Sequence, residues 1–450
     1  MRISRRDVLS GLSMIGLSAG LLGGRRTARA ANDDYRALVC VFLFGGNDGN
    51  NMVVPVDARY ADYAAARRQL TDGGLALAMD QLLPLAPASG PAQFGFHPSM
   101  PELQQLWNQG SLAVLFNVGT LVAPTSKADD SAGRVPRPES LMSHQDQQNQ
   151  WQTSLPDRPS RTGWGGRLAD QLPSAPLPPL VSVAGNVLFA LGASSHPLAV
   201  PGAGGPTFGL SGFNSSAGSR ALVTAMDVLR GLDLDNALIQ SVAGETAAAF
   251  AASGMLSPVL SGTGSTTDAL FESQPSVLGN QLLQVARIIE ARSVLGATRQ
   301  IFFVAIGGFD THNDQLDRQG PLLAEVSSSL SAFHAATVQL GVASQVTTFT
   351  LSDFGRTLAP ASGGGSDHAW GNHHLVLGGA VQGRQTYGTF PTLALGGPDD
   401  FTAQGRWLPT TSTDQYAATL ARWFGVAPGD LTAVLPNLGR FASADLGFLG

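Results

Sequence analysis

Blocks of apolar residues alternate with amphipathic segments along the chain, and this alternation predicts an α/β fold. Residues 37–44 form a continuous β-prone apolar run, which is typical of a strand buried on both faces of a parallel sheet. Further strands are expected at 112–118, 179–190, 301–306 and 346–351. Helices are expected at 99–108, 138–153, 220–232, 278–297, 318–340 and 414–426. This alternation indicates a doubly wound α/β sheet. Segment 251–276, rich in Gly, Ser and Thr, is expected to be a surface excursion.

The first thirty residues have the pattern of an export leader. Arg5 and Arg6 stand between a serine and the sequence Asp-Val-Leu, which is the twin-arginine signature. The apolar stretch 12–22 is much shorter than the roughly 20 apolar residues of a spanning helix, which disfavours a membrane anchor. Ala28-Arg29-Ala30 supplies a small-x-small cleavage site. We therefore expect a twin-arginine signal peptide at 1–30, cleaved near Ala30/Ala31, with the twin-arginine translocase as partner and the periplasm as destination.

Composition argues against nucleic-acid binding, disulfide bonds and a membrane span in the mature chain. Charged residues make up 13% of the chain, the net charge is −6, and no basic patch lies outside the leader, so nucleic acid is not an expected partner. The single cysteine, Cys40, excludes an intramolecular disulfide. A chain that folds in the reducing cytoplasm before export does not need one. No other segment is long and apolar enough to span a bilayer, so no membrane span is expected in the mature chain.

Polar residues follow directly after three of the predicted strands. Asp48 comes after the first strand, and Asp310 and His312 come after the fourth. Asp353 and Arg356 come after the fifth. Because ligands of open α/β sheets bind beyond the carboxyl ends of the strands, we expect these side chains at one edge of the sheet.

A glycine-rich loop at 363–365 leads to two further pairs, Asp367-His368 and His373-His374. Aspartate and histidine offer carboxylate oxygen and neutral imidazole nitrogen, which are the ligands that divalent metals take from proteins. Glycines let the backbone bring several such ligands onto one ion. The sequence therefore predicts a metal site assembled from several strand-end loops.

Some of these residues also have purely structural interpretations. Asp48 lies in a Gly-Asn-Asp-Gly turn, where Asp is common for conformational reasons. Asp353 is also suited to capping the turn that follows it, and Arg356 to bracing that turn. His373 and His374 are adjacent, so in an extended segment their side chains point in opposite directions and only one would face the site. The metal interpretation is favoured for the remaining four, Asp310, His312, Asp367 and His368.

A second polar constellation spans residues 138–148. Ser143 and Asp146, three residues apart, share one face of a helix start. His144 beside Ser143 suggests a serine hydrolase, but no Gly-x-Ser-x-Gly elbow lies nearby, and sequence neighbours on a helix do not face each other. Two interpretations remain for Ser143, a nucleophile activated by metal ions and a helix N-cap.

Five motifs occur in a fixed order: Val-Phe-Leu-Phe-Gly-Gly-Asn-Asp-Gly-Asn-Asn-Met, Ser-His-Gln-Asp-Gln-Gln, Gly-Phe-Asp-Thr-His, Ser-Asp-Phe-Gly-Arg-Thr and Ser-Asp-His-Ala-Trp-Gly-Asn-His-His. With these motifs the chain resembles the twin-arginine-exported bacterial family known as domain of unknown function 1501. That family is grouped with the alkaline phosphatase-like superfamily of sulfatases and metal-dependent phosphomutases. The resemblance implies that residues 31–450 form a single α/β domain, a three-layer α/β/α sandwich with a mostly parallel central sheet.

The resemblance also implies a site. It implies an Asp after the first strand, a nucleophile at a helix N-terminus and late Asp and His ligands, usually around two divalent ions. Which of Zn, Mn, Mg or Ca these are stays open. The positions that match are Asp48, Asp310, His312, Asp367 and His368 as metal ligands and Ser143 as the nucleophile. The full expected site adds Asp353 and His373 as metal ligands and Arg356 as a catalytic residue. Two features depart from the superfamily pattern: a glycine loop precedes Asp367-His368, and the Asp-x-His spacing at 310–312 is short.

The function expected from these residues is an exported metal-dependent hydrolase of phosphate or sulfate esters, acting on a small ester or an envelope glycan. The alternative is a catalytically inactive phosphatase-like fold that serves as an envelope binding protein. A sulfatase with formylglycine is disfavoured, because Cys40 lies inside a strand and Ser154-Leu-Pro156-Asp-Arg158 matches only the bare Ser-x-Pro-x-Arg pattern.

Overall fold

The computed structural model describes residues 34–68, 74–173, 175, 177–206, 216–232, 235–262, 264–272 and 275–450. Residues 36–450 form one compact unit. The expected signal peptide at 1–30 lies outside the described residues.

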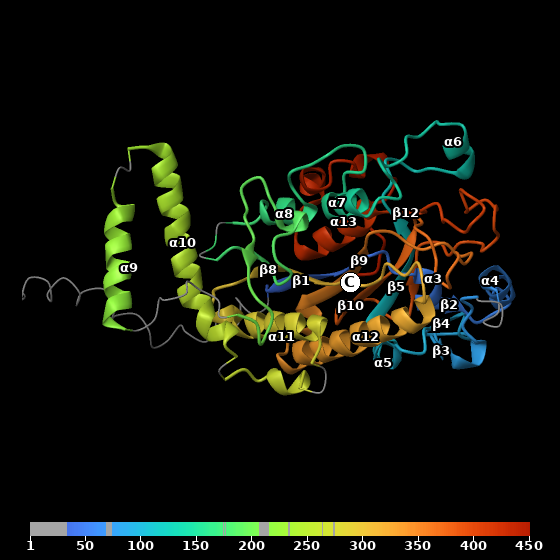
Figure 1. The fold of residues 1–450 in the computed structure, drawn as a ribbon, viewed down its shortest axis with the longest axis horizontal. Coiled ribbons are helices and arrows are strands. Elements are labelled where there is room, and N and C mark those ends of the chain that lie inside the picture. Colours follow the sequence, from blue (N-terminus) through green and yellow to red (C-terminus); the bar gives the residue numbers. More distant parts are fainter. Residues whose placement is uncertain are drawn as a thin grey trace, which may run out of the picture. The chain divides into compact units, whose positions relative to one another are not determined.

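A twisted sheet runs through the centre of this unit, with β1 (Arg36–Leu43) between β8 (Arg299–Ile306) and β9 (Val346–Ser352) (Figure 1). Both pairings are parallel, and Cys40 lies opposite Phe303 on one side and Phe349 on the other. The sheet continues through β6 (Leu180–Ser182) and β7 (Leu198–Ala199) at one edge, and through β10 (Asn372–Gly378), β5 (Leu112–Gly119), β11 (Thr386–Tyr387) and β12 (Thr411–Ser412) at the other. Nearly every residue of the three central strands is buried, as the apolar runs predict.

Strand β10 was not among the expected strands, and it takes up His373 and His374, which were expected in a strand-end loop. β10 runs antiparallel between β9 and β5 and is buried throughout. Its polar start, Asn-His-His, hides the strand pattern in the sequence. Of the segment 179–190, only β6 is a strand, and a 3₁₀-helix occupies Leu188–Ala190.

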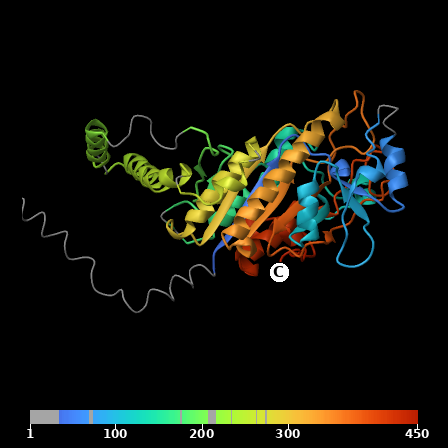
Figure 2. The same ribbon diagram turned by 90° about the horizontal axis from the view of Figure 1, so that it is seen from below.

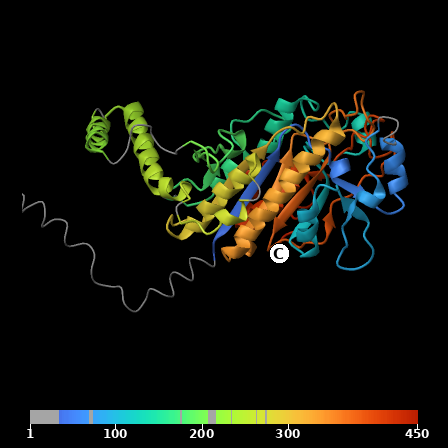
Figure 3. The same ribbon diagram turned by 60° about the horizontal axis from the view of Figure 1, so that its bottom comes forward.

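Helices cover both faces of the sheet. α11 (Val277–Glu290) and α12 (Gln315–Gln339) lie along one face, and α5 (Pro101–Asn108) lies beside α12 (Figure 2). α7 (His144–Thr153), α8 (Trp164–Ala169) and α13 (Thr413–Phe424) lie on the opposite face, above the sheet in Figure 1, and α14 (Leu431–Val434) packs against α8 and α13. Figure 3 shows α11 and α12 in front of the strands. The expected three-layer α/β/α sandwich with a mostly parallel central sheet is confirmed.

Alternation along β1 explains how the sheet holds these layers. Leu38, Cys40 and Phe42 point to one face, where they pack with Trp164 of α8 and Tyr416 of α13 in a continuous buried cluster. Close packing of such large side chains gives each helix one position on the sheet.

The remaining elements lie at the ends and edges of the sheet. A small antiparallel sheet joins β2 (Val53–Pro55), β4 (Phe94–Phe96) and β3 (Leu83–Pro84). The other helices are α3 (Gly49–Met52), α4 (Tyr60–Arg67), α6 (Lys127–Ser131), α9 (Ala217–Arg230) and α10 (Ala237–Leu260). Further 3₁₀-helices are Met79–Gln81, Asp268–Leu270, Ala291–Ser293, Ala343–Gln345, Pro428–Asp430 and Leu438–Arg440. In the described part of the chain, no helix is long and apolar enough to cross a membrane.

Two helix boundaries correct the expectations. α10 includes residues 251–260 and buries Ala252, Leu256 and Leu260, so the first ten residues of the expected surface excursion at 251–276 are helical. α7 begins at His144 rather than at 138, because Ser140 has a positive φ of 46° and Ser143 caps the helix. The late start places His144 in the first turn of α7.

The first turn of α13 holds a buried carboxyl group. Asp414 is almost fully buried, and neither carboxylate oxygen has a hydrogen-bond partner of normal geometry. Burial raises the pKa of Asp414 to about 7, and the nearby Ser154 hydroxyl and Arg167 guanidinium offset only part of this effect. The folded chain therefore holds a proton that the unfolded chain releases near pH 4.

We predict that Asp414→Asn stabilises the protein more at pH 8 than at pH 5. The folded-state pKa lies above the unfolded value, so wild-type stability falls as the pH rises from about 4 to about 7. At pH 8 the free energy of unfolding of the wild type is reduced by up to roughly 4 kcal/mol by the cost of ionising buried Asp414, and Asn does not carry this cost. Urea unfolding of both proteins at the two pH values measures it, with exposed Asp80→Asn as control. An equal gain at pH 5 and pH 8 would contradict the assignment.

Candidate metal centre

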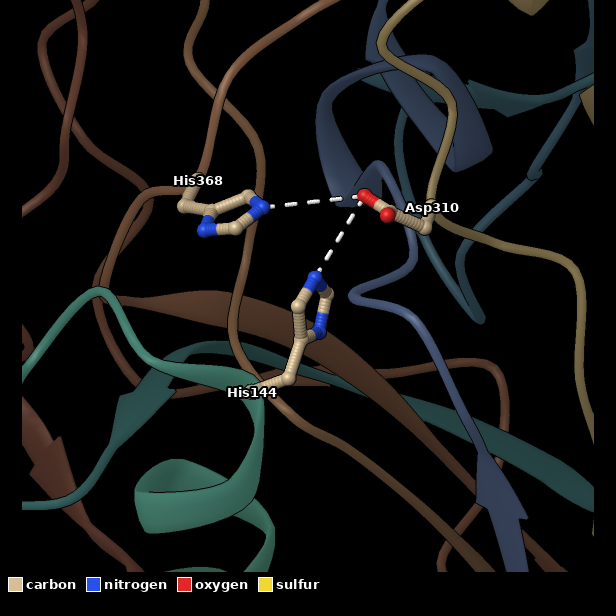
Figure 4. A group of neighbouring side chains, drawn as sticks. All are labelled: His144, Asp310 and His368. Carbon is tan, nitrogen blue, oxygen red and sulfur yellow. Dashed lines mark ion pairs between the residues drawn. The ribbon is translucent and has the colours of Figure 1, made fainter.

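Two loops and a helix start converge beyond the carboxyl ends of β8 and β9. The loop after β8 contributes Asp310, the segment before β10 contributes His368, and the first turn of α7 contributes His144. One ligand atom from each lies within 4.8 Å of the other two. Figure 4 shows both imidazole rings directed at the Asp310 carboxylate.

Hydrogen bonds fix the orientation and tautomer of His144. Its Nδ1 donates to Asp353 Oδ2 at 2.7 Å, and Asp353 is fully buried at the end of β9. Its Nε2 is buried without a hydrogen-bond partner and lies 3.5 Å from Asp310 Oδ1. The hydrogen bond to Asp353 raises the pKa of His144, and burial offsets part of the effect. Nε2 is thus held toward Asp310 on a ring made more basic by its carboxylate partner.

His368 is held in the same manner by the main chain. Its Nδ1 donates to the carbonyl oxygen of Met142 at 2.7 Å, and its ring stacks on Phe354. Its Nε2 lies 3.6 Å from Asp310 Oδ1. Burial lowers the pKa of His368, with a further contribution from the positive charge of Arg356. This ring therefore favours the neutral form that a metal ligand needs.

Arg356 also contacts Oδ1 of Asp310. The Arg356 side chain is fully buried, and its Nη2 hydrogen-bonds Asp310 Oδ1. Partial burial alone would raise the pKa of Asp310, but the hydrogen bond and charge of Arg356 outweigh it and lower the pKa. Asp310 is therefore an anion over the whole neutral pH range.

The distances within this cluster fit a metal ion. Two ligands with bonds of about 2.0–2.1 Å in tetrahedral geometry lie roughly 3.3 Å apart. The two Nε2 atoms of His144 and His368 lie 3.5 and 3.6 Å from Asp310 Oδ1. The partnerless buried Nε2 of His144 is the clearest sign of a missing partner. Two imidazoles and one carboxylate form a donor set that suits zinc and other divalent transition metals.

His312 and Asp367 lie at the open side of the cluster. His312 Nε2 is 3.1 Å from Asp310 Oδ1 and 2.8 Å from His368 Nε2. Its Nδ1 is 3.3 Å from Asp367 Oδ1, and its side chain is 39% exposed. Asp367, expected as a ligand, thus contacts the ring of His312 instead, and His312 has the accessibility that a proton-transfer group requires.

Asp48, expected as a metal ligand, lies in a different network. Both of its carboxylate oxygens are 2.6 Å from Nη2 of Arg67, and both side chains are fully buried. It also accepts from Gln315 Nε2 and from the backbone N–H of Asn50. These bonds occupy the carboxylate, so its role in the structure is to stabilise the turn into α3.

His373, the other expected ligand outside the cluster, and His374 lie inside the sheet. His373 packs against Phe116 and accepts a hydrogen bond from the backbone N–H of Asn117. His374 points to the other face, against Trp151. Burial lowers the pKa of His373 to about 4 and that of His374 to about 3. Both are neutral core side chains at neutral pH.

The two residues expected to be catalytic occupy structural positions. Ser143 is the N-cap of α7, and its Oγ accepts from the backbone N–H of Asp146 at 3.4 Å. Arg356 directs its guanidinium at backbone carbonyls and Asp310, as a brace does. Ser154 of the Ser-x-Pro-x-Arg pattern is buried at the other end of α7. This position removes it from the cluster.

Two features of the cluster were not predicted from the sequence. One is the presence of His144, and the other is the Met142 carbonyl that orients His368. The adjacent serine drew attention to a hydrolase triad, whereas the partner of His144 is Asp353, more than 200 residues away. A first-turn histidine in a Ser-His-Gln-Asp motif was the available signal. A hydrogen bond to a backbone carbonyl, such as that from His368 to Met142, does not depend on the side chain of the acceptor residue and cannot be predicted from its type.

The chain was compared with solved structures, curated proteins and protein-family models. A solved structure similar to this chain is the PsFucS1 sulfatase from Pseudoalteromonas sp., at 12% sequence identity and a TM-score of 0.34, covering 90% of this chain and 72% of that chain. A likeness this distant carries no argument about function. No curated protein matches the chain. The family model "Protein of unknown function (DUF1501)" matches residues 35–435. The family expected from the motifs is thus confirmed: the chain belongs to the DUF1501 family.

Proposed function

We propose that the protein is a metal-dependent hydrolase of phosphate or sulfate esters, with its ion at His144, Asp310 and His368. The observation that supports this best is the partnerless buried Nε2 of His144, held toward the Asp310 carboxylate by the hydrogen bond from Nδ1 to Asp353. Two ions were expected from the resemblance. The described residues contain one three-ligand group, so the proposal is limited to one ion.

Each residue of the cluster has a distinct part in this proposal. His144 presents Nε2, His368 presents a nitrogen that burial keeps neutral, and Asp310 presents a carboxylate that Arg356 keeps ionised. Bound there, a divalent ion would act as a Lewis acid on an ester oxygen and stabilise the negative charge that develops on the ester oxygens during hydrolysis. Asp353 and the Met142 carbonyl keep the two rings in the required tautomer. His312, exposed beside them, is positioned to take a proton from attacking water or to give one to the leaving alcohol.

The nucleophile in this proposal is water rather than Ser143. The Ser143 oxygen is engaged as a helix cap, and no hydrogen bond or ion pair among the described residues joins it to the cluster. The cluster itself offers the base and the electrostatic stabilisation that an attacking water needs.

The second candidate is a binding protein without turnover. The structural position of Ser143 favours it, because the hydroxyl expected as the nucleophile is engaged as a helix cap. Export by the twin-arginine route and action in the periplasm belong to either candidate and are supported by the leader sequence at 1–30.

We predict that His368→Ala abolishes stoichiometric metal binding and hydrolysis. It removes one of three ligands and leaves the sheet packing intact. The measurement is elemental analysis after chelation and refolding with Zn²⁺ or Mn²⁺, followed by turnover of aryl phosphate and aryl sulfate. His196→Ala, at an exposed histidine outside the cluster, is the matched control and should behave as wild type. Wild-type protein without stoichiometric metal would refute the proposal. Metal without turnover would favour the binding protein.

We predict that Asp353→Asn weakens metal binding without removing a ligand. Loss of a carboxylate behind a metal-bound histidine typically costs about 10–100-fold in affinity. Competition with a chromogenic chelator measures the affinity, and exposed Asp80→Asn serves as control. An unchanged affinity would show that the hydrogen bond between His144 and Asp353 does not support a metal ligand.

We predict that Ser143→Asn retains wild-type kcat, because Asn caps helices as well as Ser but has no hydroxyl group. Turnover and thermal stability are measured together with Ser143→Ala, which loses the cap and about 0.5–2 kcal/mol of stability. A large fall in kcat for both variants, with stability kept in Ser143→Asn, would make Ser143 the nucleophile.

A further inference from the structure

The segment 396–406 is a rigid loop organised around one buried carboxylate. Asp400 is fully buried, and its oxygens accept hydrogen bonds from the backbone N–H groups of Gly396, Thr402, Gly405 and Arg406 at 2.8–3.0 Å. A carboxylate that collects four backbone donors holds the loop in one conformation. The loop therefore fixes the main chain at Arg406.

Arg406 extends from this loop to the metal centre. Its Nε donates to the carbonyl oxygen of His368 at 2.7 Å. Its Nη1 contacts the side chains of Thr402 and Gln404, and within the described residues its Nη2 makes no hydrogen bond. The side chain is half-buried and interacts electrostatically with Asp367, which lies at the open side of the cluster.

Arg356 and Arg406 thus differ in the number of N–H donors that remain free to bind a ligand. Arg356 is buried and directs its donors at three loops and at Asp310. Arg406 is accessible, has an unused N–H pair and forms no ion pair within 4 Å among the described residues. A guanidinium with free donors is well suited to the oxygens of phosphate or sulfate, which it binds in a fork.

We propose that Arg406 binds the anionic oxygens of the substrate's phosphate or sulfate group and selects for charged esters. This inference rests on the proposed function and names the recognition element of the same site. An anion arriving here meets the carboxylates of Asp310 and Asp367, both about 45% exposed. The charge of Arg406 offsets that repulsion beside Asp367, so a neutral ester would not depend on it.

The test compares Arg406→Gln and Arg406→Lys with wild type and with Arg440→Gln. Arg440 is a matched control, because it also bonds one backbone carbonyl, that of Val122, and pairs with Asp157 away from the cluster. Calorimetric titration with inorganic phosphate and with inorganic sulfate is carried out on the protein as isolated and after Zn²⁺ loading. KM and kcat follow for aryl phosphate, aryl sulfate and neutral aryl acetate.

We expect Arg406→Gln to weaken anion binding about 10-fold or more, with Arg406→Lys in between and Arg440→Gln unchanged. For the charged esters KM should rise more than kcat falls, and aryl acetate should be unaffected. Equal anion binding by wild type and Arg406→Gln overturns the inference, as does the absence of anion binding in wild type. Anion binding that depends on Arg406, without turnover of any ester, supports this inference and refutes the proposed hydrolase.

Discussion

The candidate metal centre depends on one buried guanidinium, that of Arg356. Its donors reach the carbonyls of Gly46 and Ser366 and the carboxylate of Asp310, which belong to three loops far apart in sequence. Removing an arginine from water is costly unless its donors are satisfied, so the loops must close around it for the fold to be stable. Gly45 has a φ of 110°, and a Cβ there would collide with the backbone of Asp310. The glycines after β1 thus let the three loops approach.

The carboxylates near the strand ends divide into two groups according to their cation. Asp48 is paired with buried Arg67 and joined to Gln315 at the start of α12, which ties the first strand loop to a covering helix. Asp310 meets both Arg356 and the histidine rings at one oxygen, Oδ1. The first arrangement gives local order, and the second gathers the histidine rings around one carboxylate oxygen.

The histidines show how environment decides chemistry. His373 and His374 are buried among aromatic rings and stay neutral because burial disfavours their charged forms. His144 and His368 are each anchored through Nδ1, which leaves Nε2 directed at one point. A metal centre requires this anchoring, since a freely rotating ring would lose binding energy in becoming ordered.

The sequence by itself determined the layers of the fold and the place of the site. Apolar runs such as 37–44 and 301–306 mark the central strands, because a strand buried on both faces must be apolar throughout. Since parallel strands share one carboxyl edge, the polar residues after them had to meet there. Only the tertiary structure decided which of them form the cluster. Asp48 and His373 are removed from it by Arg67 and by β10, and His144 enters it through Asp353 and the late start of α7. A ligand set is a matter of distances of a few ångströms between loops hundreds of residues apart, and such distances are set by packing rather than by local residue pattern.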